Sequence, residues 1–424
     1  MPAISADPAA ARAFAVVVVD RLRRAGHEAL WAGGCVRDEL LGRTPADYDV
    51  ATSARPEQVR AVFGTRGTIA VGAAFGVITV LGPRSAGQVE VATFRSDMAY
   101  TDGRHPAGVT FTDAREDALR RDFTINGLFL DPVTGTVHDH VGGRADLAAG
   151  IVRAIGSPGM RFGEDHLRML RAVRFAAVFG FALEEATRDA IVRMAHLVTA
   201  VSPERIAAEL RAMVSRPGRR RALDLLAETG LAREVLPELA ATEGSGIDPA
   251  AWDESARVVD ALDEPDLPLA LSILAHGRPT AAVAAVADRL RLSNRERQTA
   301  AWLHGAAAEF APLDAAALDR RPWSRVQPWL AHDAAPRLAD MLRAGAACGR
   351  GAPEGAAWVS AKLRAPREAL DPPPLVSGHD LLAAGIPAGR ALGRALANVR
   401  DWQLDGVVGS REEALRRLEA ERRH

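Results

Sequence analysis

The sequence predicts an α+β domain at the N-terminal end of the chain, followed by a long all-helical part. The first 150 or so residues mix helical and strand periods. From about residue 156 onward the segments are rich in Ala, Leu and Arg, have apolar residues at i, i+3 and i+4, and contain no convincing strand. With 424 residues, of which 48% are hydrophobic, the chain is long enough for about three domains.

The elements of the N-terminal part follow from local patterns. Residues 8–25 are expected to form a helix, and residues 46–52 a strand. The β-branched runs 71–81 and 88–94 are separated by glycines and a proline, which predicts a hairpin. Pro- and Gly-rich breaks in the helical part mark candidate boundaries at 216–218, 347–355 and 371–374. We therefore divide the chain into a head (1–150), a neck (151–230), a body (231–350) and a tail (351–424).

The composition excludes several classes of protein. The formal net charge of -1 gives no global sign of nucleic-acid binding, so any site for a polyanion must be local. Two cysteines are too few for a disulfide framework or a cysteine zinc site. The basic residues are 52 arginines and one lysine, Lys362, so a single arginine is weak evidence of a phosphate contact. A Walker A loop and a Rossmann glycine fingerprint are both missing.

Nothing in the sequence indicates a membrane segment. The longest early apolar run, residues 13–19, is too short to span a bilayer, and no small-residue cleavage site follows it. We therefore expect a cytoplasmic protein with no membrane partner.

A pair of glycines, Gly33 and Gly34, opens a predicted helix that continues as Cys-Val-Arg-Asp-Glu-Leu-Leu-Gly-Arg. Paired glycines at a helix start let backbone N–H groups approach a phosphate closely. Arg37 lies one turn into this helix, where it could hold a further phosphate oxygen. The segment is thus a candidate phosphate-binding site.

Two acidic residues follow this segment. Asp47 and Asp49, at i and i+2 on the predicted strand, are expected to project to the same face. Carboxylates placed in this way can share two divalent metal ions about 3.5–4 Å apart, the arrangement used for in-line phosphoryl displacement. Glu90 interrupts a later apolar run and is a candidate third carboxylate. An isolated Asp-x-Asp is usually a turn or a solvated edge, but the preceding glycine pair makes this one far more specific.

The stretch from Gly33 to Asp49 resembles the signature of the tRNA nucleotidyltransferase and poly(A) polymerase family, in the DNA polymerase β superfamily. The resemblance continues in order along the chain. Residues 120–126 are similar to the family's second motif, in which an Arg, an Asp and an Asn hold the phosphates and ribose of the nucleotide. Residues 164–168, with two further arginines, resemble the class II motif that reads the incoming base. Residues 378–382 are similar to the tail region of the family.

This resemblance implies a polymerase β-like nucleotidyltransferase head with a small mixed sheet, followed by an extended all-α neck, body and tail. It also implies an enzyme that adds C, C and A from CTP and ATP to the 3′ end of tRNA and releases pyrophosphate. Mg²⁺ would bind at Asp47 and Asp49, with Glu90 as a further catalytic carboxylate. The tail would bind the acceptor and T-arm of tRNA, and no protein partner can be inferred. The nucleotide-binding residues would be Gly33, Gly34, Arg37, Arg121, Asp122, Asn126, Asp165, Arg168, Arg171 and Arg174.

The chemistry of Asp165 and Arg168 fits a base-reading role. They are three residues apart, so on a predicted helix they would share a face. A carboxylate accepts from an exocyclic amine, and a guanidinium donates to a ring nitrogen or carbonyl. Cytosine and adenine offer an amine beside an unprotonated ring nitrogen, whereas guanine and uracil offer a carbonyl beside an N–H. The alternative is an ordinary intrahelical salt bridge, with a contribution of about 0.3–0.5 kcal/mol.

Several other functions compete with full CCA addition. Residues 71–77 resemble the tRNA-specific branch of the family and argue against a poly(A) polymerase. Residues 96–110 resemble the flexible loop that CC-adding members lack, which argues against a CC-adding-only enzyme and leaves an A-adding-only enzyme open. An inactive RNA-binding protein would be expected to have lost Asp47 or Asp49. The pair His276-Gly277 lacks the Asp of an HD-type phosphohydrolase, so we expect no such activity.

The neck has a local excess of arginine. Arg205, Arg211, Arg216 and the run 219–221 could face an RNA backbone, or could equally lie on a solvated helix surface.

Overall fold

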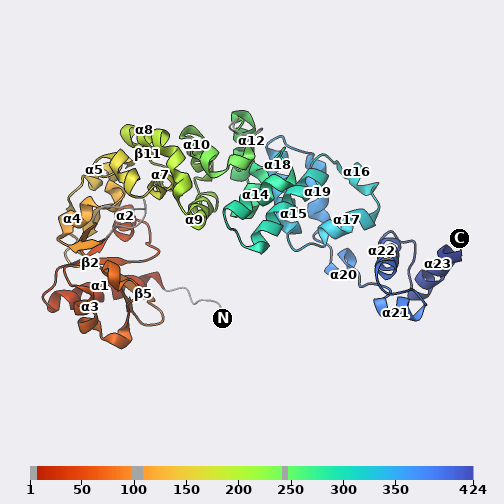
Figure 1. Ribbon diagram of the computed structural model, residues 1–424, viewed down its shortest axis with the longest axis horizontal. Helices are drawn as coiled ribbons and strands as arrows, with labels where there is room; N and C mark the ends of the chain where they lie inside the picture. Colours follow the sequence, from red (N-terminus) through yellow and green to blue (C-terminus); the bar gives the residue numbers. More distant parts are fainter. Residues whose placement is uncertain (1–6, 98–107, 241–246, 424) are drawn as a thin grey trace. The chain divides into compact units, whose positions relative to one another are not determined.

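The computed structural model describes residues 7–97, 108–240 and 247–423, so most of the expected loop at 96–110 lies outside the described residues. The chain forms two compact units, Met1–Pro237 and Glu238–His424. Among the described residues, the first unit contains a mixed sheet and helices, and the second contains helices alone (Figure 1). The predicted fold class, an α+β head followed by helices, is confirmed.

A seven-stranded sheet forms the centre of the first unit. Its strands are β1 (Ala29–Ala32), β2 (Asp49–Thr52), β3 (Thr68–Ile69), β4 (Val77–Leu81), β5 (Gln88–Thr93), β8 (Leu128–Leu130) and β9 (Val137–Asp139). Their order is β3-β4-β5-β2-β1-β8-β9, in which only β2 and β5 are parallel neighbours. The predicted hairpin is confirmed, since β4 and β5 pair antiparallel with Leu81 opposite Gln88.

Strand β2 is shorter than expected. It begins at Asp49, and residues 46 and 47 form a bend, so Asp47 precedes the strand instead of lying on it. The parallel register of β2 and β5 pairs Asp49 with Glu90. This pairing fixes the place of the sheet at which the acidic residues meet.

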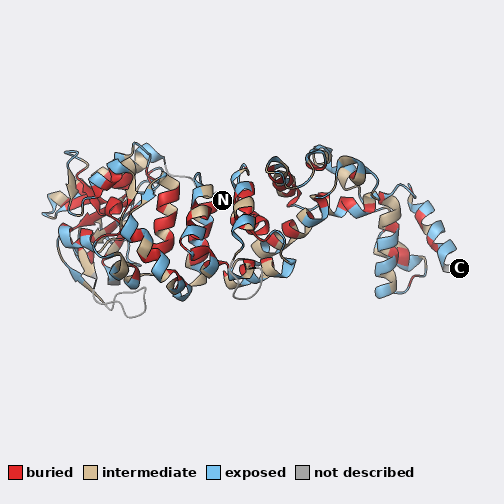
Figure 2. Cartoon of the chain, turned by 90° about the horizontal axis from the view of Figure 1, so that it is seen from above, coloured by how far each residue is buried: buried red, intermediate tan, exposed pale blue. Residues whose placement is uncertain are grey.

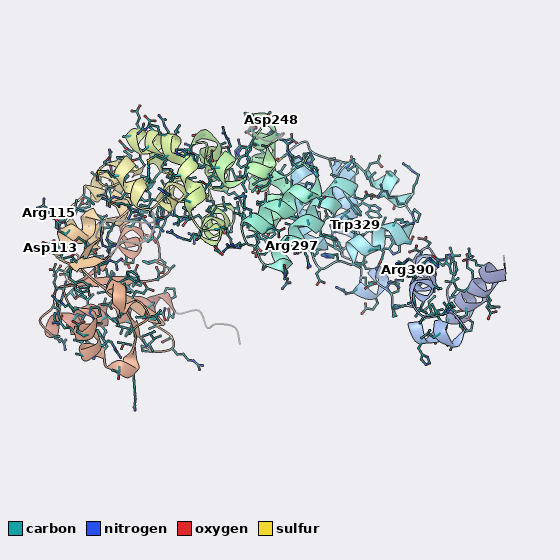
Figure 3. The ribbon with its side chains drawn as sticks, in the orientation of Figure 1. Asp113, Arg115, Asp248, Arg297, Trp329 and Arg390 are labelled. Carbon is teal, nitrogen blue, oxygen red and sulfur yellow. The ribbon has the colours of Figure 1, made fainter. Side chains whose placement is uncertain are left out.

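Helices and short strands surround this sheet. The predicted first helix is confirmed as α1 (Pro8–Arg24), whose start is capped by the Asp7 carboxylate accepting from the Ala9 N–H. Asp113 caps α4 in the same way and is labelled in Figure 3. The remaining elements are α2 (Gly34–Leu40), α3 (Pro56–Phe63), α4 (Ala114–Leu119), α5 (Gly143–Ala149), the 3-10 helices η1 (Thr65–Gly67), η2 (Ala73–Phe75) and η3 (Thr124–Asn126), and the paired strands β6 (Arg95–Asp97) and β7 (Val109–Phe111).

The neck is a helical continuation of the same compact unit. Its helices are α6 (Pro158–Glu164), α7 (Leu167–Phe179), α8 (Glu185–Met194), η4 (Ala195–Ala200), α9 (Pro203–Val214), α10 (Arg219–Glu228) and α11 (Leu231–Val235). The helix α7 packs against α9 and α10 and is buried over most of its length. The expectation of no strand after residue 156 is wrong at β11 (Ala182–Leu183), which pairs with β10 (Ile151–Val152). Two residues are too few to leave a strand period in the sequence.

The second unit is built from helices α12 to α23. Their buried faces form its interior (Figure 2), and Asp248, labelled in Figure 3, caps the first of them. Throughout the described residues of the chain, no helix has both the length and the apolar character needed to cross a bilayer. The bounds are α12 (Pro249–Asp260), α13 (Leu267–Leu274), α14 (Thr280–Arg289), α15 (Asn294–Phe310), α16 (Ala315–Asp319), α17 (Trp323–Leu330), α18 (Ala335–Ala347), α19 (Pro353–Lys362), α20 (Arg367–Leu370), α21 (Gly378–Ala383), α22 (Arg390–Leu404) and α23 (Arg411–Arg423).

Candidate functional site

A cavity of about 670 Å³ in the first unit gathers almost all of the residues that the sequence singles out. Its walls come from α2, from the segment before β2, from the residues between α4 and β8, and from α7 and α9. The sequence-predicted residues that line it are Gly33, Gly34, Arg37, Asp47, Asp49, Arg121, Asp122, Asn126, Asp165, Arg168, Arg171 and Arg174. Glu90 is not among the lining residues.

The glycine pair shapes one wall of the cavity. Gly33 has φ 73° and ψ -125°, and its N–H donates to the Leu128 carbonyl 3.1 Å away. A Cβ at this position would lie 2.7 Å from Nη1 of Arg121. A residue with a side chain would therefore be strained by the positive φ, which is the reason for glycine here, and its Cβ would also displace the end of the Arg121 side chain.

The carboxylates of Asp47 and Asp49 face the cavity without a side-chain partner. Within the described ranges, neither accepts a hydrogen bond or forms an ion pair. Burial above all, together with the negative charges of Asp47 and Glu90, raises the pKa of Asp49 to about 6, although Arg121 partly opposes the shift. Glu90 is exposed, and its negative charge raises the pKa of Asp49 from the neighbouring strand. A cation bound here would be stabilised by this concentration of negative charge.

The described residues offer few protein ligands for a metal ion. In the parts of the chain that are described, no group of three or more His, Cys, Asp or Glu side chains is arranged to hold a metal ion. The protein ligands available in the cavity are thus the two aspartates, and a bound ion would need further oxygen ligands from its substrate or from water.

A hydrogen-bonded chain links the head to the neck at Asp122. Its carboxylate accepts from the Asn126 amide at 3.0 Å, the Phe123 N–H at 2.8 Å and the Arg171 guanidinium at 2.6 Å. Burial alone would raise the pKa of Asp122, but the charge of Arg171 and these hydrogen bonds outweigh it and hold the pKa at about 2. Nη1 of Arg37 then donates to Oδ1 of Asn126 at 2.7 Å, which extends the chain to α2.

Asp165 and Arg168 do not share a helix face, so that expectation is wrong. The helix α6 ends at Glu164, Asp165 has an extended backbone with φ -146°, and α7 begins at Leu167. Both side chains nevertheless line the cavity. They form no salt bridge with each other in the structure, because Asp165 pairs with Arg205 and Arg168 pairs with Glu164.

Two residues of α9 organise this part of the cavity, and the sequence analysis missed their roles. Arg205 donates to both carboxylate oxygens of Asp165, at 2.7 and 3.3 Å, and Glu209 accepts from Arg174. From the sequence, Arg205 was expected either to contact RNA or to lie on a solvated helix surface. The one signal available was the spacing of Arg205 and Glu209, one helical turn apart on the same face.

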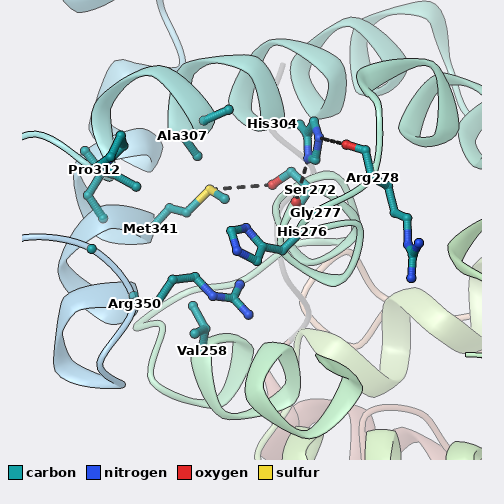
Figure 4. Close-up of a pocket in the computed structure, with 15 residues that line it drawn as sticks. Val258, Ser272, His276, Gly277, Arg278, His304, Ala307, Pro312, Met341 and Arg350 are labelled. Carbon is teal, nitrogen blue, oxygen red and sulfur yellow. Dashed lines mark hydrogen bonds between the residues drawn. The ribbon is translucent and has the colours of Figure 1, made fainter. Parts of the chain in front are cut away.

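A second cavity, of about 480 Å³, lies within the second unit (Figure 4). It is lined mainly by apolar residues, with His276 and Arg350 at one side, and Arg350 is paired with Glu254 at 2.8 Å. His304 is held between two backbone carbonyls, those of Ser272 and Arg278. None of the sequence-predicted site residues lines this cavity, so the candidate site is the one in the first unit.

Comparison with known proteins supports this choice. Residues 29–153 match the family model described as the poly A polymerase head domain. Residues 180–242 match a second model, described as a probable RNA and SrmB-binding site of polymerase A. The first match contains the glycine pair, the acidic residues and Asp122, and the second contains Arg205 and Glu209.

Among curated proteins, the chain is 45% identical over 230 residues to the CCA-adding enzyme of Geobacillus stearothermophilus and 42% identical over 222 residues to that of Lactobacillus johnsonii. The matched stretches cover 54% and 52% of this chain, and 55% and 54% of those proteins. The chain thus spans about half the length of the curated relatives it matches.

Solved structures extend the likeness to nearly the whole chain. The Bacillus stearothermophilus CCA-adding enzyme in complex with CTP is 31% identical, with a TM-score of 0.75, over 96% of this chain and 98% of that one. The Thermotoga maritima CCA-adding enzyme complexed with tRNA has the same fold, with a TM-score of 0.65 over 96% of this chain and 95% of that one, at 19% identity. The ordered motifs, the cavity that they form and this near-complete match together show that the chain belongs to the family of CCA-adding enzymes.

Proposed function

We propose that this protein adds C, C and A to the 3′ end of tRNA from CTP and ATP, without a template, and releases pyrophosphate. One observation carries the proposal: a single cavity is lined both by two carboxylates without an ion-pair partner among the described residues, Asp47 and Asp49, and by several arginines. Nucleotidyl transfer needs both, since a nucleoside triphosphate brings a polyanion to a centre that must also bind a cation. Its relative with 31% identity is a CCA-adding enzyme that binds CTP, which supports the same substrate here.

We assign the cation to Asp47 and Asp49. The raised pKa of Asp49 and the absence of a side-chain partner among the described residues fit a site for a hard divalent ion such as Mg²⁺, which prefers oxygen ligands. When bound, such an ion supplies Lewis-acid stabilisation of the charge on the phosphoryl group. The two aspartates would hold it, and Glu90 would act on Asp49 through its charge.

We assign triphosphate binding to Arg37 and Arg121, which lie close to Gly34 and Gly33 respectively. Both are already oriented by other groups, Arg37 by Asn126 and Arg121 by Asp117 at 2.9 Å. Guanidinium groups held in this way present fixed N–H donors to phosphate oxygens. Asp122 and Asn126, with Arg171, complete this wall and would position the ribose.

We assign base choice to Asp165 and Arg168. Arg205 fixes the carboxylate of Asp165, and the Glu164 carboxylate and the Arg161 carbonyl orient Arg168. An acceptor and a donor held at one wall match the amine and ring nitrogen of cytosine and adenine. The tail, residues 351–424, would bind the acceptor and T-arm of tRNA by shape. Because the proposed substrate is tRNA, we also propose that the protein acts in the cytoplasm.

The carboxylates are tested first. Changing Asp47 or Asp49 to Ala should abolish incorporation from CTP and ATP while leaving tRNA affinity nearly unchanged, because each carboxylate holds a cation and not RNA. The substrates are tRNAs ending in -N, -NC and -NCC, which also separate full CCA addition from A addition alone. Glu57→Ala, on the exposed side of α3, is the matched control and should be fully active. More than a few per cent of wild-type turnover in both Asp47→Ala and Asp49→Ala would contradict the assignment.

Removing the charge of Asp49 should stabilise the metal-free protein. Its pKa is about 6 in the folded state against an ordinary 3.8, so between about pH 4 and 6 the folded state binds more protons than the unfolded state. The free energy of unfolding therefore falls as the pH rises through this window. At pH 7 with EDTA, Asn at position 49 should raise the free energy of unfolding by about 1–3 kcal/mol, and the gain should vanish near pH 4.

Urea unfolding of the wild type and of Asp49→Asn at both pH values measures this difference. Addition of Mg²⁺ should stabilise the wild type more than the variant. Equal stability of the two proteins at pH 7 would show that the charge of Asp49 does not destabilise the folded protein.

Base choice is tested by the ratio of kcat/KM for CTP to that for UTP, on tRNA lacking its CCA end. Asp165→Ala and Arg168→Ala should each lower this ratio about 10- to 150-fold, the effect of a lost hydrogen bond to a charged group. Arg188→Ala, an exposed change on α8, should leave it unchanged. If the ratio were unchanged in both cavity variants, the two residues would have only a structural role.

A further inference from the structure

The neck helix α7 presents two aromatic rings to the head, and their surroundings are unusual. Phe175 and Phe179 are one helical turn apart, and their rings stack at 6.0 Å with an interplanar angle of 17°. Phe175 is buried, with 5% of its surface exposed, and lines the candidate cavity. Neither residue was predicted from the sequence to take part in the site.

Four arginines place their guanidinium carbons over these two rings. Arg37 lies 4.4 Å from the centroid of Phe179 and 5.1 Å from that of Phe175. Arg43 lies 4.9 Å from Phe179, and Arg171 and Arg174 lie 5.2 and 4.2 Å from Phe175. All these distances are within the range of a cation–π interaction.

Such a cluster of like charges needs compensation. Asp38, Asp122 and Glu209 pair with Arg37, Arg171 and Arg174, whereas Arg43 forms no ion pair with any described residue. A carboxylate that neutralises a guanidinium also occupies N–H groups that a phosphate would use. An aromatic ring holds the face of the guanidinium and leaves the donors in its plane free. The rings therefore stabilise positive charge without competing with an anion.

Arg37 combines both kinds of contact, because Asp38 accepts from its Nε at 2.9 Å and lies 2.8 Å from its Nη2, while the two rings hold its face. Its side chain is 9% exposed, its Nη1 donates to Asn126 at 2.7 Å, and its face lies against both rings. Asn126 donates in turn to Asp122, and Asp122 accepts from Arg171, which precedes Phe175 by one turn of α7. Arg37 is thus fixed by the neck twice, through the rings and through this chain of hydrogen bonds.

We propose that Phe175 and Phe179 are positioning residues for nucleotide binding, which orient Arg37 through its π face so that the Nη N–H donors not used by Asp38 and Asn126 meet the phosphates. This inference rests on the proposed function, because it takes the anion to be the triphosphate of the incoming nucleotide. It assigns to the neck a part in phosphate binding, in addition to base choice.

Phe181 provides a matched control. Its ring lies 5.6 Å from that of Phe179, in the same aromatic row, but no guanidinium lies over it among the described residues. A Phe→Leu change at either position keeps apolar volume and removes the π face. Only the change at Phe179 should affect an arginine.

The test is the affinity of the full chain for CTP and for inorganic tripolyphosphate, measured by calorimetry with Phe179→Leu, Phe179→Trp and Phe181→Leu. Phe179→Leu should raise the Kd for both anions, and the KM for CTP, by about 3- to 30-fold. It should change kcat less than about twofold and leave the ratio of CTP to UTP use unchanged. Phe179→Trp, which restores a π face, should recover most of the affinity. Phe181→Leu should leave the Kd at the wild-type value even if its Tm falls.

The outcomes separate this inference from the proposed function. Equal Kd values for Phe179→Leu and Phe181→Leu, or no recovery with Phe179→Trp, would overturn the positioning role even in an active enzyme. If the wild type bound both anions but extended no tRNA, the proposed function would fail and the effect of Phe179 on tripolyphosphate affinity would still decide the inference. A wild type that bound neither anion would overturn both.

Discussion

The arrangement of the site depends on keeping the carboxylates of Asp47 and Asp49 out of ion pairs with the arginines around them. Parallel pairing of β2 with β5 sets Asp49 beside Glu90, and burial together with Asp47 raises the pKa of Asp49 to about 6. Guanidinium groups in the same cavity would be expected to neutralise this charge. They do not form ion pairs with the two aspartates, because other acids engage them: Asp117 holds Arg121, Asp38 holds Arg37 and Asp122 holds Arg171. The two cavity aspartates are thus left for a cation.

Charge pairs also connect the head to the neck. Asp122 is buried, and it remains charged because Arg171 comes from α7 to meet it. Arg205 and Glu209 of α9 then fix Asp165 and Arg174, so each wall of the cavity is held by a partner from another element. Sheet and helices within the first unit are therefore joined at the site by charge pairs as well as by apolar packing. An isolated pair of this kind contributes little when exposed, but removing one partner of a buried pair is costly.

The features that have a local signal in the sequence were predicted correctly. The glycine pair, the first helix and the β4–β5 hairpin follow from short patterns, and all three are present. The shared helix face of Asp165 and Arg168 was predicted wrongly, because helical periodicity runs through residues 158–179 while the backbone breaks at Asp165. Pairs between elements, such as Arg205 with Asp165 and the arginines over Phe175, have no sequence signature, since they arise only when the helices pack. The position of Glu90 beside Asp49 likewise depends on the register of β5 against β2 and not on its spacing from Asp49 in the sequence.

The central claim is that Asp47 and Asp49 stay unpaired in order to hold a divalent cation beside the triphosphate. The most direct measurement is the anomalous scattering of Mn²⁺ in crystals of the full chain grown with CTP. The account predicts a peak within bonding distance of both carboxylates, about 2.0–2.6 Å from their oxygens, and in contact with the phosphates. The account would be contradicted by density for CTP in the cavity with no metal peak at the two aspartates, or with their carboxylates turned to pair with Arg37 or Arg121.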